Sequence, residues 1–265
     1  MYLEYWGLKR FPFENVPDPD FMYYSPEHEE ALARLLYVVR GNKGMVMITG
    51  EIGSGKTTLS RVLLQQLSDV KFDIGLMTNP ILKPLDFLRE ILYNLGLNPA
   101  RNAAKSHLLK ILNEKLLENL RNGMSTLLIF DEAHLISRKT FEEIRLLMNF
   151  QLNDRFMLTI ILLGQPELKD IVKEIKQLDQ RVATRYHLNP LNFVETRNYI
   201  KIRLEKAGST NNIIDPQALD DIYDYSKGIP RLINNICDIS LMVGFVSKAE
   251  IVDSKIIKEA ARDQG

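Results

Sequence analysis

Residues 50–58 read GEIGSGKTT, and the fold can be worked out from this stretch. Its glycines, lysine and threonine fit the spacing G-x-x-x-x-G-K-[S/T]. The apolar run 45–49 before it predicts a buried strand, and the periodicity of 57–67 after it predicts a helix. Between a strand and a helix, such glycines let the backbone curl so that successive N–H groups point at phosphate oxygens. The sequence therefore predicts a phosphate-binding loop.

The polar side chains of this loop suit a nucleoside triphosphate with its metal ion. We expect Lys56 to neutralise the β- and γ-phosphates of ATP and the Thr57 hydroxyl to ligate Mg²⁺. A structural glycine turn with a solvated lysine is the alternative, and the flanking strand and helix argue against it. The loop residues expected to bind the nucleotide are Gly50, Glu51, Ile52, Gly53, Ser54, Gly55, Lys56, Thr57 and Thr58.

A pair of acids follows a second apolar run. Residues 126–130, TLLIF, predict a buried strand that ends directly before Asp131 and Glu132. We expect Asp131 to hold Mg²⁺ and Glu132 to polarise the water that attacks the γ-phosphate. The alternative is that both acids only cap the next helix. His134 completes the string DEAH, and we expect it to be structural or to support the site, because a helicase with that string needs two lobes and this chain has room for one.

Strands and helices alternate through the first 190 residues. This order implies a parallel sheet with helices on both faces. The expected strands are 45–49, 72–78, 126–130 and 158–163, and the expected helices are 26–41, 57–67, 84–95, 105–120 and 139–151. After Pro190 the sequence predicts helices alone, at 194–206, 216–226, 231–246 and from 254 onward. We therefore expect an α/β nucleotide-binding domain over 1–190, with an irregular segment at 1–25, and a helical domain over 191–265.

The composition is that of an ordinary globular protein. Lys plus Arg and Asp plus Glu both total 34 in 265 residues, so the net charge of zero does not indicate a nucleic-acid binder, although a local basic patch stays open. The single cysteine, Cys237, lies in an apolar stretch and is expected in the core. The longest apolar run, 157–163, is far below the roughly 20 residues of a membrane helix. We expect a soluble, cytoplasmic chain without a membrane span.

Together, the lysine loop, the acidic pair, the stretch ILLGQPEL at 161–168 and GIPR at 228–231 resemble the AAA+ ATPases. That resemblance implies an α/β P-loop NTPase fold, a three-layer parallel sheet with a smaller C-terminal α-helical lid. It places Gln165 at the position that senses the γ-phosphate, where Asn, Ser or Thr is more usual. It also identifies Arg231 with the lid arginine that reaches the phosphates. A solvated arginine at a helix start is the alternative for Arg231.

The stretch LDQRVATRYHLNPL at 178–191 resembles the AAA+ segment that presents an arginine finger to a neighbouring subunit. Arg181 is the first candidate and Arg185 the second, and solvated surface arginines are the alternative. A finger acting on a neighbour implies a homo-oligomer, either a ring or a filament.

The opening YWGLKRFPFENVPDPDFMYYSPEHEEAL is similar to the N-termini of ATPases of the general secretion pathway protein A (ExeA-like) family. The shared features are Gly7-Leu8, Pro12-Phe13 and Asp18-Pro19, and GQPEL at 164–168 is typical of the same family. The resemblance implies that 23–28 borders the adenine, with Tyr24 and His28 as the contacts. Packing of these aromatics into the core remains the alternative. Full-length members continue into a membrane helix and a peptidoglycan-binding region, so the chain is expected to be a truncation or a stand-alone module.

Three functions follow from these predictions. The first is a Mg²⁺-dependent ATPase that couples nucleotide state to oligomerisation and to assembly of a partner complex, most simply a secretion or export system of the cell envelope. The second is an ATP-dependent regulator of transposition or recombination that assembles on duplex DNA. The third is a nucleotide switch that binds ATP and barely turns it over, against which the presence of Glu132 argues.

Overall fold

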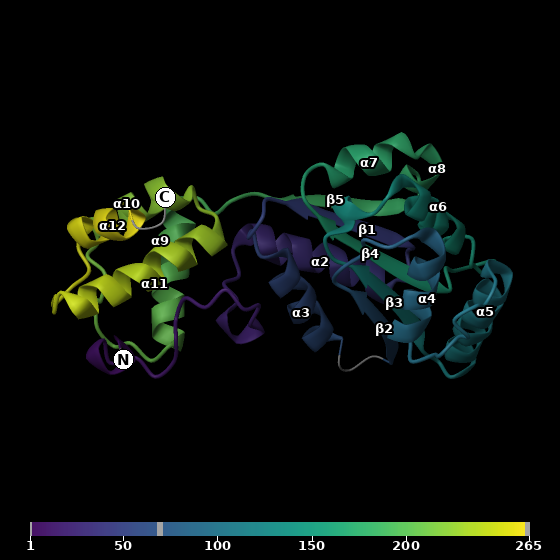
Figure 1. The fold of residues 1–265 in the computed structure, drawn as a ribbon, viewed down its shortest axis with the longest axis horizontal. Helices are drawn as coiled ribbons and strands as arrows, with labels where there is room; N and C mark the ends of the chain where they lie inside the picture. The colour runs from purple at the N-terminus through teal and green to yellow at the C-terminus, as the bar shows by residue number, and fades with distance from the viewer. Residues whose placement is uncertain (1, 68–70, 263–265) are drawn as a thin grey trace. The chain divides into compact units, whose positions relative to one another are not determined.

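The computed structural model describes residues 2–67 and 71–262, drawn in Figure 1. Contacts divide the chain into two compact units. The sheet unit comprises His28–Gly50 and Ser60–Leu188, and the helical unit comprises the residues up to Glu27, Glu51–Leu59 and those from Asn189 onward. The boundary near residue 189 lies close to the expected one at 190, whereas the N-terminal residues and the phosphate loop group with the helices.

The sheet unit is built on a five-stranded, wholly parallel sheet with the strand order β2-β3-β4-β1-β5. Its strands are β1 (Met45–Gly50), β2 (Phe72–Met77), β3 (Ser125–Phe130), β4 (Leu158–Gly164) and β5 (Val182–Leu188). Every residue of β1 and β4 is buried, because both are central strands with a covered surface on each side.

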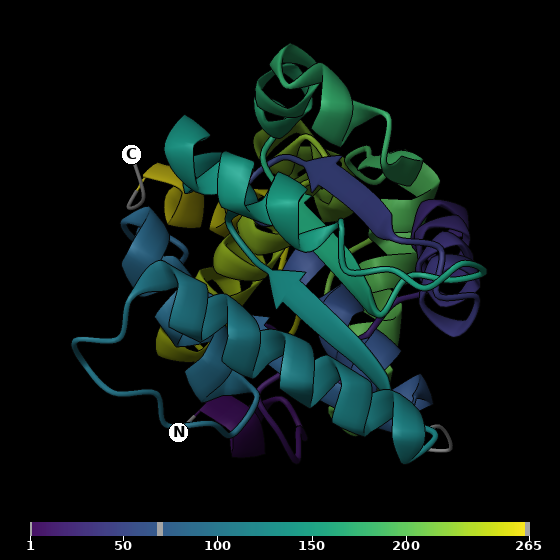
Figure 2. The same cartoon turned by 90° about the vertical axis from the view of Figure 1, so that its right-hand side faces the viewer.

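Alternate residues of the central strands point to opposite faces of the sheet. Met47, Phe130 and Leu162 belong to one large apolar core, to which the helices on their face contribute. These helices are α4 (Pro84–Asn94), α5 (Lys105–Arg121), α6 (Arg138–Leu147) and α7 (Leu168–Glu174), with α8 (Lys176–Asp179) beyond them. Ile48 and Ile129 are equally buried on the other face. Figure 2 shows α2 (Pro26–Arg40) on one side of the strands, and α4 and α5 on the other.

Most elements predicted for this unit are confirmed within one or two residues, including all four predicted strands and the helix α3 (Lys56–Gln66). Helix α6 ends at Leu147, four residues before the predicted end. The sequence analysis missed α7, α8 and β5. Strand β5 is an edge strand in which only the two end residues are buried, while the interior alternates between exposed and partly exposed residues. Its polar interior, ATRYH, carries no apolar run that would predict a strand.

The helical unit contains the predicted C-terminal helices, here α9 (Phe193–Lys206), α10 (Ala218–Ser226), α11 (Pro230–Val246) and α12 (Ser254–Arg262). An Asn192–Glu195 capping box starts α9, since each side chain accepts the backbone N–H of the other residue. Cys237 is fully buried in the core of the unit, as predicted. Among the described residues, no helix is both long and apolar enough to cross a membrane.

The N-terminal segment corrects the sequence analysis, which expected residues 1–25 to be irregular and part of the α/β domain. The segment forms a short helix α1 (Tyr2–Tyr5) and a 3-10 turn η1 (Pro19–Phe21). Trp6, Phe13 and Phe21 are buried in the same core as Cys237. The pattern of prolines and aromatics does not say which surface the rings cover, so this assignment could not be made from the sequence.

Two basic side chains of α9 hold the N-terminal segment in place. Arg203 is buried and donates to the carbonyl oxygens of Pro12, at 2.5 Å, and Glu14, at 3.1 Å. Lys206 donates to the carbonyl oxygens of Asp20, at 2.6 Å, and Met22, at 3.1 Å. Hydrogen bonds from charged donors are stronger than neutral ones. Hydrogen bonds therefore attach residues 12–22, which precede the expected adenine segment, to α9 of the helical unit.

Candidate functional site

The predicted motifs follow strands whose carboxyl ends lie at one edge of the sheet. β1 lies beside β4, yet the chain leaves β1 for β2 at one side of the sheet and leaves β4 for β5 at the other. Such a point, where connections diverge from neighbouring parallel strands, is where open α/β sheets bind ligands. The phosphate loop follows β1, Asp131 follows β3, and Gln165 follows β4.

The phosphate loop has the backbone that its glycines predict. Gly53 and Gly55 have φ angles of +82° and +97°, in the region that L side chains rarely adopt. The Lys56 side chain folds back over the loop, where its ammonium donates to the Glu51 carbonyl oxygen at 2.9 Å and lies 3.4 Å from the Ser54 hydroxyl. Lys56 is the first residue of α3 and is 6% exposed. A buried cation thus lies at the positive end of a helix.

The backbone donors of the loop fit an anionic ligand. Within residues 2–67 and 71–262, the N–H groups of Ile52, Gly53 and Gly55 donate to no protein acceptor. Three such donors beside a lysine and a helix N-terminus form a suitable cradle for phosphate oxygens. The Thr57 hydroxyl and the Asp131 carboxylate are hard oxygen donors, the type that Mg²⁺ prefers when phosphates complete its coordination.

Arg231 lies against the phosphate loop. Its backbone N–H donates to the Gly53 carbonyl oxygen at 3.3 Å, and a Cβ on Gly53 would lie 2.4 Å from the Cβ of Arg231. Pro230 starts α11 directly before it, so Arg231 occupies the first turn of that helix. The side chain is exposed and forms no ion pair within the described chain. The structure therefore brings Arg231 to the loop with its guanidinium available.

The two acids after β3 differ in environment. Asp131 is 4% exposed, and its Oδ1 accepts the Glu132 backbone N–H at 2.9 Å. Glu132 has the left-handed backbone angles φ 51° and ψ 37°, an uncommon conformation for a side chain of this size. Its side chain is 45% exposed. Strained residues of this kind cluster at functional sites, and the two positions suit a buried metal ligand and an acid with access to water.

His134 and Gln165 form a hydrogen-bonded pair at the ends of β3 and β4. The Gln165 backbone N–H donates to His134 Nδ1 at 3.3 Å, and Gln165 Nε2 lies 2.8 Å from His134 Nε2. Nδ1 also lies 3.5 Å from Glu132 Oε2. His134 belongs to the 3-10 turn η2 (Ala133–Leu135). The ring thus lies between the expected sensor and the expected base.

The two arginine-finger candidates have different surroundings. Arg181 donates to the Met148 carbonyl oxygen at 2.6 Å and to Asn149 Oδ1 at 2.7 Å, and it is half-buried. Arg185 lies in β5, and its exposed guanidinium pairs with Asp179 at 2.7 Å. Both carboxylate and guanidinium of this pair are more than a third exposed, so the pair contributes little stability and is readily exchanged.

The two expected adenine contacts are also unlike each other. The Tyr24 side chain is among the exposed large hydrophobic groups, with 44% exposure. His28, in the first turn of α2, is only 4% exposed. Of the two, only Tyr24 is therefore accessible to a ligand in this structure.

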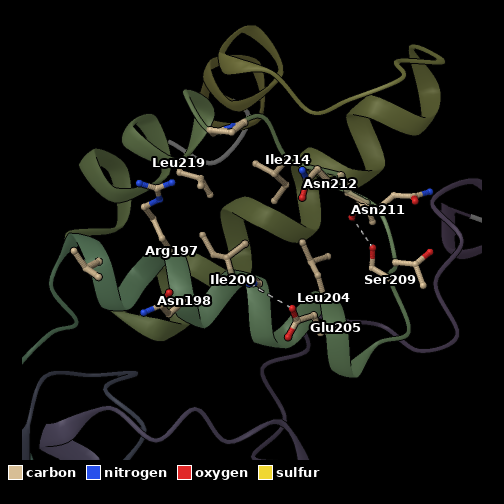
Figure 3. A pocket seen from close by; sticks show the side chains of 15 residues that line it. Arg197, Asn198, Ile200, Leu204, Glu205, Ser209, Asn211, Asn212, Ile214 and Leu219 are labelled. Carbon is tan, nitrogen blue, oxygen red and sulfur yellow. Dashed lines mark hydrogen bonds and ion pairs between the residues drawn. The ribbon is translucent and has the colours of Figure 1, made fainter.

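A pocket of about 510 Å³ in the helical unit lies between α9 and the segment 209–214. Figure 3 shows Ile200, Leu204 and Ile214 on its apolar walls, with Arg197 and Asn212 nearby. None of the fifteen lining residues belongs to a predicted motif. This pocket is therefore a separate feature from the residues expected to bind nucleotide.

The AAA domain family matches residues 39–172, half of the chain, from the end of α2 into α7. The chain belongs to the AAA domain family. The match spans the phosphate loop, the acidic pair and Gln165, which are the residues from which the AAA+ class was predicted. The predicted AAA+ class is thereby confirmed.

This AAA protein is similar in sequence to a curated relative and in fold to several solved structures. It is 39% identical over 247 residues, 92% of its length, to General secretion pathway protein A of Aeromonas hydrophila, as the N-terminal motifs predicted. The chain spans 45% of the length of that relative. Among solved structures, it is similar to the Aeropyrum pernix ORC2 protein in ADPNP and ADP complexes, with a TM-score of 0.70 and 19% identity over 96% of this chain and 72% of that one.

A second solved structure, the Aeropyrum pernix ORC1 protein in complex with DNA, gives a TM-score of 0.72 and 16% identity over 96% of this chain and 69% of that one. At such identities the likeness shows the fold alone. The predicted P-loop α/β fold with additional helices is thus confirmed for this AAA protein.

His134 was expected to be structural or to support the site, but its partner was not predicted. That partner, Gln165, lies 31 positions away in the chain. The DEAH string gives the histidine but cannot give that partner. The signal that could have found it is the parallel order of β3 and β4, which brings the residues after each strand together.

Proposed function

We propose that this AAA protein binds Mg²⁺-ATP at the phosphate loop and hydrolyses it. The observation that carries the proposal is the loop itself: three N–H donors without a protein acceptor among the described residues, two glycines with positive φ, and a buried lysine at a helix N-terminus. Residues Gly50–Thr58 cradle the phosphates, and Lys56 exchanges the Glu51 carbonyl oxygen for a phosphate oxygen. Thr57 and Asp131 hold the Mg²⁺ ion, which supplies positive charge to the phosphates.

For hydrolysis, we assign the general base to Glu132, whose exposed side chain has access to water. Gln165 contacts the γ-phosphate through its amide, and Arg231 contacts the phosphates from the first turn of α11. The closeness of Arg231 to Gly53 supports this last role. Tyr24 is the better adenine contact, because His28 is buried.

Binding is tested by titrating the protein with a fluorescent ATP analogue. Lys56→Ala removes the cation of the loop, and the affinity is expected to fall by at least about tenfold, since hydrogen bonds to charged groups contribute about 1.5–3 kcal/mol. The matched control is Lys139→Ala, which removes an exposed lysine and is expected to leave the affinity unchanged. Equal affinities for both variants would refute the assignment of the loop.

We further propose that the active form is a homo-oligomer in which one subunit supplies an arginine to its neighbour. Arg185 is now the first candidate, because its guanidinium is exposed and, among the described residues, pairs with the exposed carboxylate of Asp179. Arg181 is second, because two acceptors already hold its guanidinium. Hydrolysis per subunit should therefore rise with protein concentration, measured by phosphate release across the range in which sedimentation shows assembly.

The process that this ATPase serves is proposed from its relative. The 39% identity to General secretion pathway protein A supports a role in assembling a secretion or export system of the cell envelope, from the cytoplasm and with a protein partner. Deletion of the gene should reduce the amount of exported protein in the medium, and a Lys56→Ala copy should fail to restore it. Regulation of transposition on duplex DNA has no support here beyond a shared fold, and is not proposed.

A further inference from the structure

The imidazole of His134 makes contacts through both ring nitrogens, and these contacts select one tautomer of the neutral ring. Nδ1 accepts the Gln165 backbone N–H at 3.3 Å, so Nδ1 carries no proton. A neutral imidazole must then carry its proton on Nε2. Nε2 lies 2.8 Å from Gln165 Nε2, and two nitrogens that both carry protons cannot form a hydrogen bond. A ring that donates there requires an acceptor, so we infer that the carboxamide is turned by 180°, which places Oε1 against Nε2.

This arrangement has a consequence for both neighbours of the ring. With its oxygen bonded to Nε2, the Gln165 carboxamide turns its NH₂ group away from the ring, which makes it a donor for an anionic ligand. Glu132 Oε2 lies 3.5 Å from an Nδ1 that has no proton, so the ring offers this carboxylate no hydrogen bond. The same tautomer therefore leaves the Glu132 carboxylate to bind water.

We propose that His134 is a positioning residue, which holds the Gln165 carboxamide with its NH₂ group turned away from the ring and available to bind the γ-phosphate. This inference rests on the proposed hydrolysis of ATP and assigns a role that the proposed function does not use. His134 contacts neither nucleotide nor water in this scheme; it acts through Gln165.

The backbone around the pair is built for this short approach. A Cβ on Gly164, the residue before Gln165, would lie 3.1 Å from the His134 backbone nitrogen and 2.9 Å from Leu168 Cδ2. A larger residue at the end of β4 would therefore require η2 and the Leu168 side chain to shift. His134 is 11% exposed, so water competes little for its two hydrogen bonds.

Two substitutions separate the two hydrogen bonds. His134→Gln places an amide NH₂ near the position of Nε2 and keeps a donor for the Gln165 oxygen. His134→Asn reaches only the position of Nδ1 and keeps the acceptor for the Gln165 N–H. We expect kcat to fall about tenfold for His134→Asn and less than about threefold for His134→Gln. Each variant loses one hydrogen bond, but only His134→Asn loses the bond to the Gln165 side chain that orients the carboxamide. The ATP Kd should stay within about twofold for both.

The control and the double substitution complete the test. His107→Asn makes the same change on the exposed surface of α5 and should leave kcat unchanged. Gln165→Ala should remove the effect of His134, so that Gln165→Ala with His134→Asn is no slower than Gln165→Ala alone. Additive losses, or equal losses for His134→Asn and His134→Gln, would show that His134 does not act through Gln165.

A spectroscopic measurement separates this inference from the proposed function. The imidazole ¹⁵N shifts of the wild-type protein are assigned by loss of the signal in His134→Asn. At a pH at which the ring is neutral they should show the tautomer with its proton on Nε2, and Gln165→Ala should shift the Nε2 signal. A ring protonated on Nδ1 overturns the inference even if ATP is hydrolysed. Absence of hydrolysis in the wild type, with the expected tautomer present, would refute the proposed function instead.

Discussion

Gly53→Ala tests the contact between the phosphate loop and α11. Gly53 has a φ of +82°, which costs an alanine about 1 kcal/mol. The added methyl group would also start 2.4 Å from the Arg231 Cβ, so one backbone must move. That movement strains the hydrogen bond from the Arg231 N–H to the Gly53 carbonyl oxygen and overpacks the contact, which together cost about 2 kcal/mol. We expect a loss of about 3 kcal/mol in the free energy of unfolding.

The assay is urea denaturation, with nucleotide affinity measured on the same samples. Gly7→Ala is the matched control in the same unit, because Gly7 has a φ of +66° and no atom within 4 Å of an added Cβ. It should lose only the backbone contribution of about 1 kcal/mol. Gly53→Ala should lose about 2 kcal/mol more than this control and should bind ATP more weakly.

The Cβ contact itself is isolated by changing Arg231. Arg231→Gly removes the Cβ that meets the new methyl group, whereas Arg231→Ala keeps it, and both lack the guanidinium. Gly53→Ala should therefore lower the free energy of unfolding by about 1 kcal/mol in the Arg231→Gly background and by about 3 kcal/mol in the Arg231→Ala background. Equal costs in the two backgrounds, or a Gly53→Ala loss no larger than that of Gly7→Ala, would refute the reasoning.

Two further predictions concern the arginine finger and the buried thiol. A mixture of Lys56→Ala and Arg185→Ala should regain part of the ATPase activity that each variant lacks alone, because some interfaces then join an intact loop to an intact finger. Recovery with Arg181→Ala in place of Arg185→Ala would identify Arg181 as the finger. Recovery with neither arginine variant, while both still oligomerise, would exclude a finger. Burial raises the pKa of the Cys237 thiol, so an aromatic disulfide reagent at pH 8 should react only as fast as the helical unit unfolds, and rapid stoichiometric labelling of the folded protein would contradict this.

The parts of the fold that followed from the sequence are those set by local pattern. The central strands are short apolar runs because both of their faces are covered, so β1, β3 and β4 could be predicted. Strand β5 could not, because an edge strand exposes alternate residues and its middle carries Thr184, Arg185 and His187. The docking of Trp6 and Phe13 onto the helices depends on contacts far apart in the chain, and no local pattern predicts these.

For the site, residue types in fixed spacing predicted the phosphate loop and the acids after β3, because glycine conformations and metal ligands restrict which residues can serve. Spacing could not show that Glu132 adopts a left-handed backbone or that Arg181 is held by Met148 and Asn149. It also could not show that His134 bonds to Gln165. These properties depend on how neighbouring strands end, which only the assembled sheet determines.

The central claim is that the chain hydrolyses ATP with Glu132 as the base. Single-turnover phosphate release should be compared between the wild-type protein and Glu132→Gln, each saturated with Mg²⁺-ATP, with the ATP Kd of both measured in parallel. The account predicts a Kd within about twofold and a rate at least about 100-fold lower for Glu132→Gln, the scale for loss of a general base. A wild-type rate in Glu132→Gln would contradict the assignment of the base, and a wild type that binds ATP without releasing phosphate would identify a nucleotide switch.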